Sequence, residues 1–330
     1  ALYRHFQFFM IYFLMEQYKM KEGMPMIYRL KPATKDYLWG GERLREQYHI
    51  ESDCHPLAEA WMLSCHPDGP SVVADGPCEG LTLPQLIERL GRGCLGTRCE
   101  DKTFFPVLIK LIDAKDRLSL QVHPSDDYAR IHEGQLGKTE MWLVLDCGPE
   151  AFIYYGFEHE ISREEMAERI AANTLTEVLH AAPVKPGDMF FIPSGTLHAI
   201  GKDILIAEVQ QNSNVTYRVY DYGRVGADGK LRALHIEQAL AVTNRAPVQA
   251  DWDFGGHLAA CDYFVTDCME GPFSGECGAD SFLSLVILEG DGSLTCGGET
   301  VSCRKGDSFF LPAGSGAYQV TCGKALVTGI

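Results

Sequence analysis

One stretch of the chain occurs twice, and this repeat constrains the fold more than any other feature of the sequence. The run PGDMFFIPSGTLH at residues 186–198 returns 119 residues later as KGDSFFLPAGSGA at residues 305–317, with Gly, Asp, both Phe, Pro and the second Gly identical. A Gly-Asp turn, an apolar strand and a Pro-x-Gly corner are typical of a hairpin in a double-sheet jelly roll, because Gly permits a tight turn and Pro lacks the N–H that a strand ladder needs. Two copies predict two jelly rolls.

Short apolar runs closed by Gly, Pro and Asp dominate the rest of the chain, which predicts a mainly β protein of antiparallel strands with a few helices. We expect strands at 105–112, 141–145, 151–155, 189–192 and 204–209, and helices at 82–90, 164–179 and 236–242. Ser162 and Glu165 form the S-x-x-E pattern of a helix start.

The repeat also sets the expected domain organisation. We place one jelly roll, with helical segments and a metal site, at residues 26–250, and a second, smaller one without a metal site at 251–330. Residues 1–25 are treated as an N-terminal extension. Their apolar run at 6–15 resembles the core of a signal peptide, but it is too short to span a bilayer and no small-residue cleavage site follows it.

Composition excludes several classes of partner. The chain has 29 Lys and Arg against 45 Asp and Glu, a net charge of −16, so its general field repels nucleic acid and anionic membranes, and we expect neither as a partner. An anionic ligand must therefore be held by a few locally placed basic residues. The 12 cysteines include no C-x-x-C pair and are expected to be reduced thiols, which favours a cytoplasmic location.

Four polar residues associated with three separate strand regions suggest a metal site. Gln121 and His123 alternate along a strand and so share a face, Glu140 opens the next apolar strand, and His198 follows the corner of the first repeat copy, where the second copy has Ala317. Two imidazoles, a carboxylate and an amide oxygen can converge on a divalent ion in the mouth of a barrel. Each residue alone is more often a solvated or core polar group, and it is the combination that favours a metal.

These motifs resemble the type I mannose-6-phosphate isomerases, in their short bacterial form, which belong to the cupin superfamily. The resemblance rests on YLWGG at 37–41, AEAW at 58–61, FPVLIKLIDA at 105–114, SLQVHPSDD at 119–127, GKTE at 137–140 and QNSNVTYR at 211–218, and it extends from about residue 26 to the end. It implies two cupin-type jelly rolls and an enzyme that interconverts mannose 6-phosphate and fructose 6-phosphate, with a small sugar phosphate as its partner. It also implies one Zn²⁺ per chain, held by Gln121, His123, Glu140 and His198.

The same resemblance assigns catalytic roles to Arg218, Glu208 and Lys138. Isomerisation needs a base beside the carbonyl and a positive group for the enediolate, so Arg218 would stabilise charge and Glu208, partly desolvated and titrating near neutrality, would be the base. The base could also be a metal-bound hydroxide, and Glu208 could instead be a buried partner of Arg218. Ser119, Lys138 and Trp39 are candidate substrate contacts, although Trp39 is equally typical of a core.

Two other functions remain open at this stage, because one scaffold supports many chemistries. An iron-dependent oxygenase with two His and one carboxylate is disfavoured by Gln121, which would occupy a coordination position that O₂ needs, and by the nearby Lys138 and Arg218. A catalytically silent protein that binds sugar phosphates is disfavoured by the presence of every catalytic residue type. The sequence does not indicate an oligomeric state.

Overall fold

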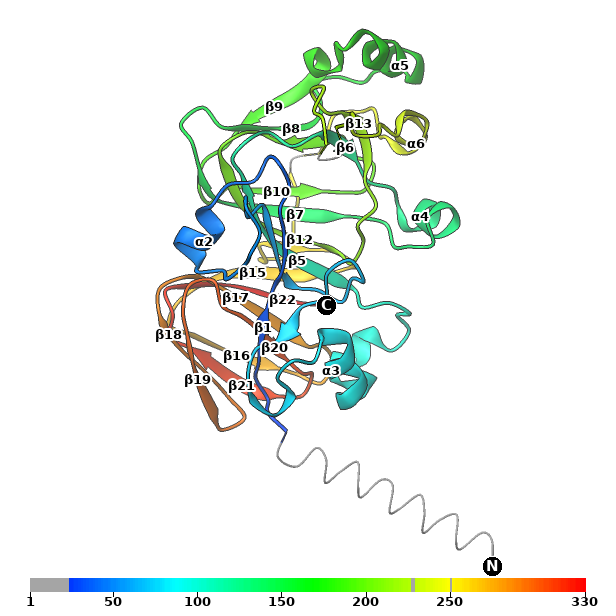
Figure 1. Cartoon of the computed structure of the whole chain (residues 1–330). Coiled ribbons are helices and arrows are strands. Elements are labelled where there is room, and N and C mark those ends of the chain that lie inside the picture. The colour runs from blue at the N-terminus through cyan, green and yellow to red at the C-terminus, as the bar shows by residue number, and fades with distance from the viewer. Residues whose placement is uncertain (1–23, 227–228, 250) are drawn as a thin grey trace, which may run out of the picture.

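The computed structural model describes residues 24–226, 229–249 and 251–330, and it consists mainly of four antiparallel sheets arranged in two stacked bodies (Figure 1). The expected extension at 1–25 therefore lies outside the described residues, except for residues 24 and 25. The mainly β fold class is confirmed.

The upper body in Figure 1 contains a six-stranded and a five-stranded sheet. In spatial order the six-stranded sheet is β10 (Met189–Ile192), β7 (Glu140–Cys147), β12 (Ile204–Gln211), β5 (Val107–Ala114), β3 (Glu59–Leu63) and β2 (Ala33–Lys35). The five-stranded sheet is β13 (Tyr217–Tyr220), β6 (Leu120–Val122), β11 (His198–Ile200), β8 (Phe152–Phe157) and β9 (Leu179–Pro183). All five expected strands are present, with ends that differ by up to two residues from the expected ones.

The lower body contains a seven-stranded and a four-stranded sheet. The seven-stranded sheet is β14 (Ala259–Ala260), β15 (Val265–Glu270), β22 (Lys324–Gly329), β17 (Leu283–Glu289), β20 (Ser308–Leu311), β1 (Tyr28–Lys31) and β4 (Val72–Val73). The four-stranded sheet is β16 (Phe273–Cys277), β21 (Gly316–Val320), β18 (Gly292–Cys296) and β19 (Glu299–Cys303). Two of its strands, β1 and β4, lie before residue 75, whereas the other five lie after residue 250. The seven-stranded sheet therefore contains strands from both sides of the expected boundary near residue 250.

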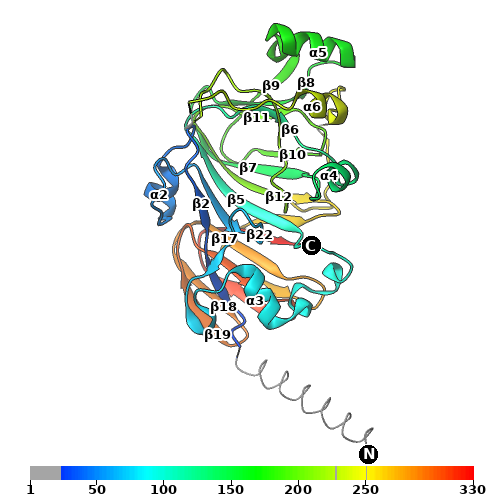
Figure 2. The same ribbon diagram turned by 45° about the vertical axis from the view of Figure 1, so that its right-hand side comes forward.

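Side-chain alternation along β12 shows how the layers stack. Ile204 and Ile206 pack into a cluster shared with the five-stranded sheet, whereas Leu205, Ala207 and Val209 pack into another shared with the seven-stranded sheet. Successive side chains of a strand point to opposite faces, so the six-stranded sheet is covered on both sides. The order of layers is thus five-, six-, seven- and four-stranded, and Figure 2 shows β17 and β22 directly beneath β5.

Helices cover the edges and the outer face of this stack. They are α2 (Arg43–Tyr48), α3 (Leu83–Leu90), α4 (Asp126–His132), α5 (Arg163–Ala172) and α6 (Ile236–Val242), with short 3₁₀ turns at η1 (Gly76–Cys78), η2 (Arg92–Leu95), η3 (Thr97–Cys99) and η4 (Leu175–Val178). Ser162 caps α5 as expected, by accepting a hydrogen bond from the Glu165 N–H. The expected helix at 164–179 is shorter than predicted, because Asn173 adopts a left-handed φ of 57° and ends it.

The repeat corresponds to the same local structure in both bodies. Its first copy forms β10 and leads into β11, and its second copy forms β20 and leads into β21. Gly187 and Gly306 both have φ near 92°, a left-handed conformation that favours glycine. Asp188 and Asp307 each accept a hydrogen bond from the backbone N–H three residues earlier.

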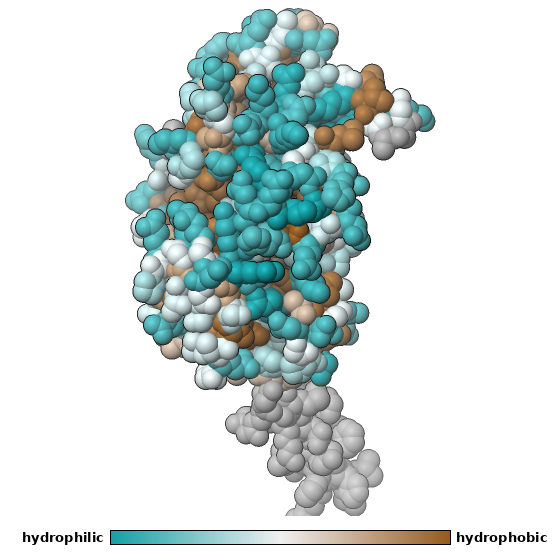
Figure 3. All heavy atoms as spheres, turned by 60° about the vertical axis from the view of Figure 1, so that its left-hand side comes forward, coloured by the Kyte–Doolittle hydropathy of each residue, from teal (hydrophilic) through white to brown (hydrophobic). Residues whose placement is uncertain are grey.

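The surface also fits a chain of high net charge. The face in Figure 3 is mostly hydrophilic, and its hydrophobic side chains occur in small separate groups. No helix among the described residues is long and apolar enough to cross a membrane. No disulfide joins the cysteines of this part of the chain.

Candidate active site

Three buried side chains meet between the five- and six-stranded sheets. His123 follows β6, His198 opens β11 and Glu140 opens β7, and one potential ligand atom from each lies within 4.8 Å of the others. His198 Nε2 is 3.3 Å from Glu140 Oε1, and His123 Nε2 is 3.6 Å from Glu140 Oε2. Within the described ranges, this is the one group of three or more His, Cys, Asp or Glu side chains placed to share a metal ion.

Both imidazoles have the orientation and charge state of metal ligands. His123 Nδ1 is 2.8 Å from the Val215 carbonyl oxygen and His198 Nδ1 is 2.8 Å from that of Thr196, so each Nδ1 carries the proton and donates it. Each Nε2 lone pair then points to the centre of the cluster, which is the arrangement that backbone carbonyls impose on metal-binding histidines. Burial, followed by the charge of Lys138, lowers the pKa of His123 well below its usual value and that of His198 to about 3, so both rings are neutral at pH 7.

The cluster contains buried acceptor atoms that a cation would satisfy. His198 Nε2 and Glu140 Oε1 are buried and have no hydrogen-bond partner among the described residues, which is costly unless a further group binds them. Burial raises the pKa of Glu140 to about 7 against the opposing effect of Lys138, whose ammonium contacts both Glu140 and His123 Nε2. A divalent ion would offset the cost of keeping this carboxylate charged.

Three neighbouring strands place the other predicted residues beside the cluster. Gln121 in β6 lies directly opposite His198 in β11 on one side and Arg218 in β13 on the other. Directly opposed side chains project to the same face of a sheet, so Gln121 faces the side on which His198 meets the cluster. The Arg218 Nε donates to Ser119 Oγ at 3.2 Å, and its Nη1 donates to the Ala233 carbonyl at 3.1 Å.

Glu208 differs from the expectation in its partner and in its pKa. It pairs with Lys110, whose Nζ is 2.9 Å from Glu208 Oε2, and it accepts a hydrogen bond of 2.9 Å from Trp142 Nε1; no contact with Arg218 occurs. Burial alone would raise the pKa of Glu208, but the ammonium groups of Lys110 and Lys138 outweigh it and lower the pKa to about 2. The residue is therefore ionised at pH 7, and the expected titration near neutrality is wrong because two lysines face this carboxylate.

These groups line one polar pocket of about 290 Å³. Ser119, Gln121, Lys138, Glu208 and Arg218 all contribute to it. Trp39 also lines the pocket while being only 5% exposed, and it stacks on Tyr37 with ring centroids 5.5 Å apart, so it is both a core residue and part of the wall. The structure thus brings every predicted catalytic and substrate-binding residue to one cavity, and Lys138 connects this cavity with the three-residue cluster because its ammonium contacts His123 and Glu140.

The members of this pocket that sequence reasoning missed include Glu59, Lys110, Arg232 and His235. Lys110 is 5% exposed in β5, where Asp113 is the other charged residue, and a single Lys inside a buried strand was the available signal. Burial opposes its charge, but Glu208 and Glu59 raise its pKa above the usual value. Arg232 and His235 come from a connection that has no local motif.

Family models match two separate parts of the chain. Residues 27–140 match the catalytic domain of type I phosphomannose isomerase, and residues 257–328 match the cupin domain of mannose-6-phosphate isomerase.

Individual relatives cover most of the chain as well. The mannose-6-phosphate isomerase ManA of Bacillus subtilis is 39% identical over 303 residues, which is 88% of this chain and 94% of the relative. The mannose-6-phosphate isomerase of Streptococcus mutans is 41% identical over 289 residues, or 83% of this chain and 89% of the relative.

Solved structures show the same architecture. The crystal structure of the mannose 6-phosphate isomerase from Bacillus subtilis superposes with a TM-score of 0.84 at 35% identity, covering 92% of this chain and 99% of that one. A putative mannosephosphate isomerase from Archaeoglobus fulgidus, at 24% identity and a TM-score of 0.74, shares the fold over 92% of this chain and 96% of its own.

Proposed function

The chain belongs to the type I phosphomannose isomerase family and is an isomerase of sugar phosphates, and we propose that it interconverts mannose 6-phosphate and fructose 6-phosphate by proton transfer through an enediol or enediolate. The observation that carries this proposal is the buried cluster of His123, Glu140 and His198, which Lys138 connects to a polar pocket lined by Glu208 and Arg218. Moving a carbonyl between neighbouring carbons needs these elements: a proton acceptor and a positive field for the developing oxyanion.

We propose that the cluster, together with Gln121, holds one Zn²⁺ per chain. The unpaired Nε2 of His198 and Oε1 of Glu140 fit this ion, and so do the two neutral imidazoles. Zinc, when bound, supplies a Lewis acid that polarises the sugar carbonyl and orients the substrate. Iron oxygenase chemistry is disfavoured because Gln121, as a fourth ligand, would occupy the coordination position that O₂ needs, and because Lys138, Arg218 and Arg232 in the pocket suit an anionic substrate.

The cations of the pocket are suited to holding the phosphorylated sugar against a chain of net charge −16. Arg218, fixed by Ser119 and the Ala233 carbonyl, presents a rigid guanidinium that matches oxyanions. Arg232 and Lys138 line the same cavity. We assign Arg218 to charge stabilisation, Ser119 and Lys138 to substrate contact and Trp39 to the wall that excludes water from the sugar.

We assign the proton transfer to Glu208. Its carboxylate is held by Lys110 and Trp142, faces the pocket and is ionised at pH 7, so it is in the form that accepts a proton. Because its low pKa makes it a weak base, the reaction needs the positive groups of the pocket to acidify the sugar C–H. Glu208→Gln keeps the size of the side chain and should lower kcat by on the order of 10²- to 10⁴-fold.

A coupled isomerase assay with and without chelator tests the function. We expect turnover of mannose 6-phosphate, its loss on chelation and its recovery with Zn²⁺. Elemental analysis should find one zinc per chain, lost in His198→Ala and retained in the exposed control His180→Ala. Activity that survives chelation, or zinc content unaffected by His198→Ala, would refute the metal assignment, whereas a zinc-loaded protein with no turnover would refute the reaction.

A further inference from the structure

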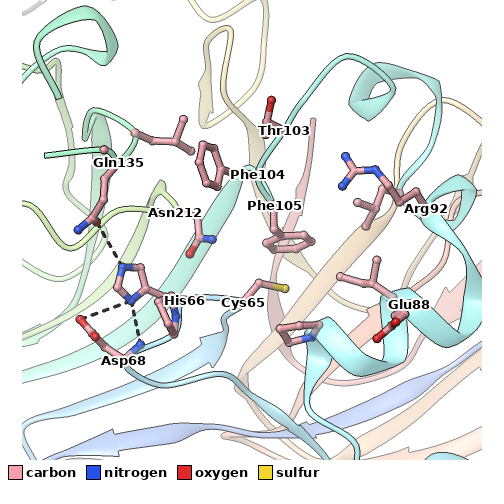
Figure 4. Close-up of a pocket in the computed structure, with 16 residues that line it drawn as sticks. Cys65, His66, Asp68, Glu88, Arg92, Thr103, Phe104, Phe105, Gln135 and Asn212 are labelled. Carbon is pink, nitrogen blue, oxygen red and sulfur yellow. Dashed lines mark hydrogen bonds and ion pairs between the residues drawn. The ribbon is translucent and has the colours of Figure 1, made fainter. Parts of the chain in front are cut away.

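A second cavity lies outside the catalytic pocket and is about twice as large, at about 620 Å³. It is bounded by α3, by η2, by the segments at 65–68, 103–105 and 134–136, and by Asn212 (Figure 4). Most of its wall is apolar, formed by Ile87, Leu95, Phe104, Phe105 and Leu136. A cavity of this size with apolar walls and a few polar groups is typical of a site for a small molecule.

Polar groups lie at both ends of the cavity. Figure 4 shows His66, Gln135 and Asn212 on one side, the two Phe rings beside them, and Glu88 and Arg92 on the opposite side. Asn212 Oδ1 is buried and has no hydrogen-bond partner in the described part of the chain. Because a buried acceptor without a partner is costly, this oxygen calls for an N–H or O–H donor.

At the end of the cavity that holds Asn212, the carboxylate of Asp68 is half exposed and lies 3.5 Å from His66 Nδ1. The Asp68 N–H donates to His66 Nδ1 at 3.2 Å, so Nε2 holds the ring proton and faces Gln135 Oε1 at 3.5 Å. Burial lowers the pKa of His66, which keeps the ring neutral at pH 7. We propose that the cavity is a second binding site, for a largely aromatic molecule whose single N–H or O–H group donates to Asn212.

The residues after Asn212 connect this cavity with the metal cluster. The Val215 carbonyl accepts the His123 Nδ1–H at 2.8 Å, and Asn214, which lines the catalytic pocket, donates to Asp68 Oδ2 at 2.9 Å. On the other side, Gln211 Oε1 accepts the Thr139 N–H, next to Lys138 and Glu140, at 2.9 Å. A ligand that draws Asn212 towards it therefore acts on a segment that orients His123, so we include in the proposal that occupancy changes turnover.

Indole is a suitable probe because it is aromatic, uncharged and has one N–H donor, and 1-methylindole lacks only the donor. Calorimetric titration should show saturable binding of indole at one site, and binding about 3- to 10-fold weaker for 1-methylindole, the range expected for one hydrogen bond. In Asn212→Ala the two probes should bind alike. Indole that does not saturate, or an Asn212→Ala variant that still prefers it, would overturn the site.

Two variants on α3 separate this cavity from other apolar surfaces. Glu88 lines the cavity and is exposed, so Glu88→Trp should fill the mouth and abolish binding, whereas Arg89→Trp, its exposed neighbour outside the cavity, should not. Both variants should keep the basal isomerase activity. Adding saturating indole should change kcat or KM in the wild type and in Arg89→Trp but not in Glu88→Trp. Equal binding by both variants would overturn the site, and binding without any change in kinetics would overturn the coupling.

Discussion

The ion pair between Lys110 and Glu208 gives a sharp prediction about stability. Both side chains are buried, their charged atoms are 2.9 Å apart, and Glu59 lies 3.9 Å from the same ammonium. Lys110→Met preserves the length of the side chain but removes the charge. It leaves Glu208 with only the Trp142 N–H and Lys138, whose Nζ is 3.9 Å away.

The expected magnitude follows from this inventory. Removing one partner of a buried ion pair costs about 3–5 kcal/mol, because the other charge is left without compensation. The two remaining contacts of Glu208 place Lys110→Met near the lower limit, about 3 kcal/mol. In Lys110→Met/Glu208→Met no uncompensated charge remains at this pair, so the double variant should cost less than the sum of the two single changes by about 1–3 kcal/mol.

The four proteins to compare are the wild type, Lys110→Met, Glu208→Met and the double variant. Their stability can be measured by urea unfolding at pH 7 and a fixed zinc concentration, followed by tryptophan fluorescence and circular dichroism. The m-values must agree between variants for the comparison to report stability. A cost below about 1 kcal/mol for Lys110→Met, or additive single changes, would show that solvent reaches this pair and that the low pKa of Glu208 has another origin.

Three further predictions concern other parts of the molecule. Arg218→Lys should lower kcat by on the order of 10²-fold or more while leaving the unfolding midpoint nearly unchanged, because an ammonium cannot reproduce a fixed guanidinium; an unchanged kcat in steady-state assays would make the residue structural. Deleting residues 251–330 should leave the remaining chain insoluble, or molten by near-ultraviolet circular dichroism, because it uncovers the face of the six-stranded sheet that packs on the seven-stranded sheet. A soluble product that unfolds cooperatively would contradict this shared core. Burial lowers the pKa of His66, so as the pH falls below about 6.5 this residue binds a proton more readily in the unfolded state than in the folded state, and the free energy of unfolding decreases. In His66→Gln, urea titrations should show a smaller decrease in this free energy between pH 7 and 5. An unaltered dependence on pH would refute the role of His66.

The sequence predicted the parts of this structure that have a local signal. The repeat at Gly187 and Gly306 identified two equivalent strands because a left-handed turn restricts the residue type. His123, Glu140 and His198 were recognisable only in combination, because a single polar residue at the end of an apolar strand is common without a function.

Features that depend on distant parts of the chain were not predictable in this way. The pKa of Glu208 depends on Lys110, which is 98 residues away in sequence and opposite it in the sheet. The pairing of β1 with β20 has no signal in either strand, and the end of α5 at Asn173 depends on one residue adopting a left-handed conformation.

The pairing of β1 with β20 also determines the order in which the molecule can be completed. Tyr28 lies opposite Phe310, so β1 pairs with a strand that is synthesised about 280 residues later. At roughly 5–20 residues per second, the nascent chain carries β1 without that neighbour for tens of seconds. The strands of the upper body are all synthesised within that interval, but the face of the six-stranded sheet that packs on Phe310 and Leu326 stays uncovered. Synthesis of β20 and β22 thus both pairs β1 and closes the core beneath the site, and until then the chain exposes apolar surface of the kind that favours aggregation and chaperone binding.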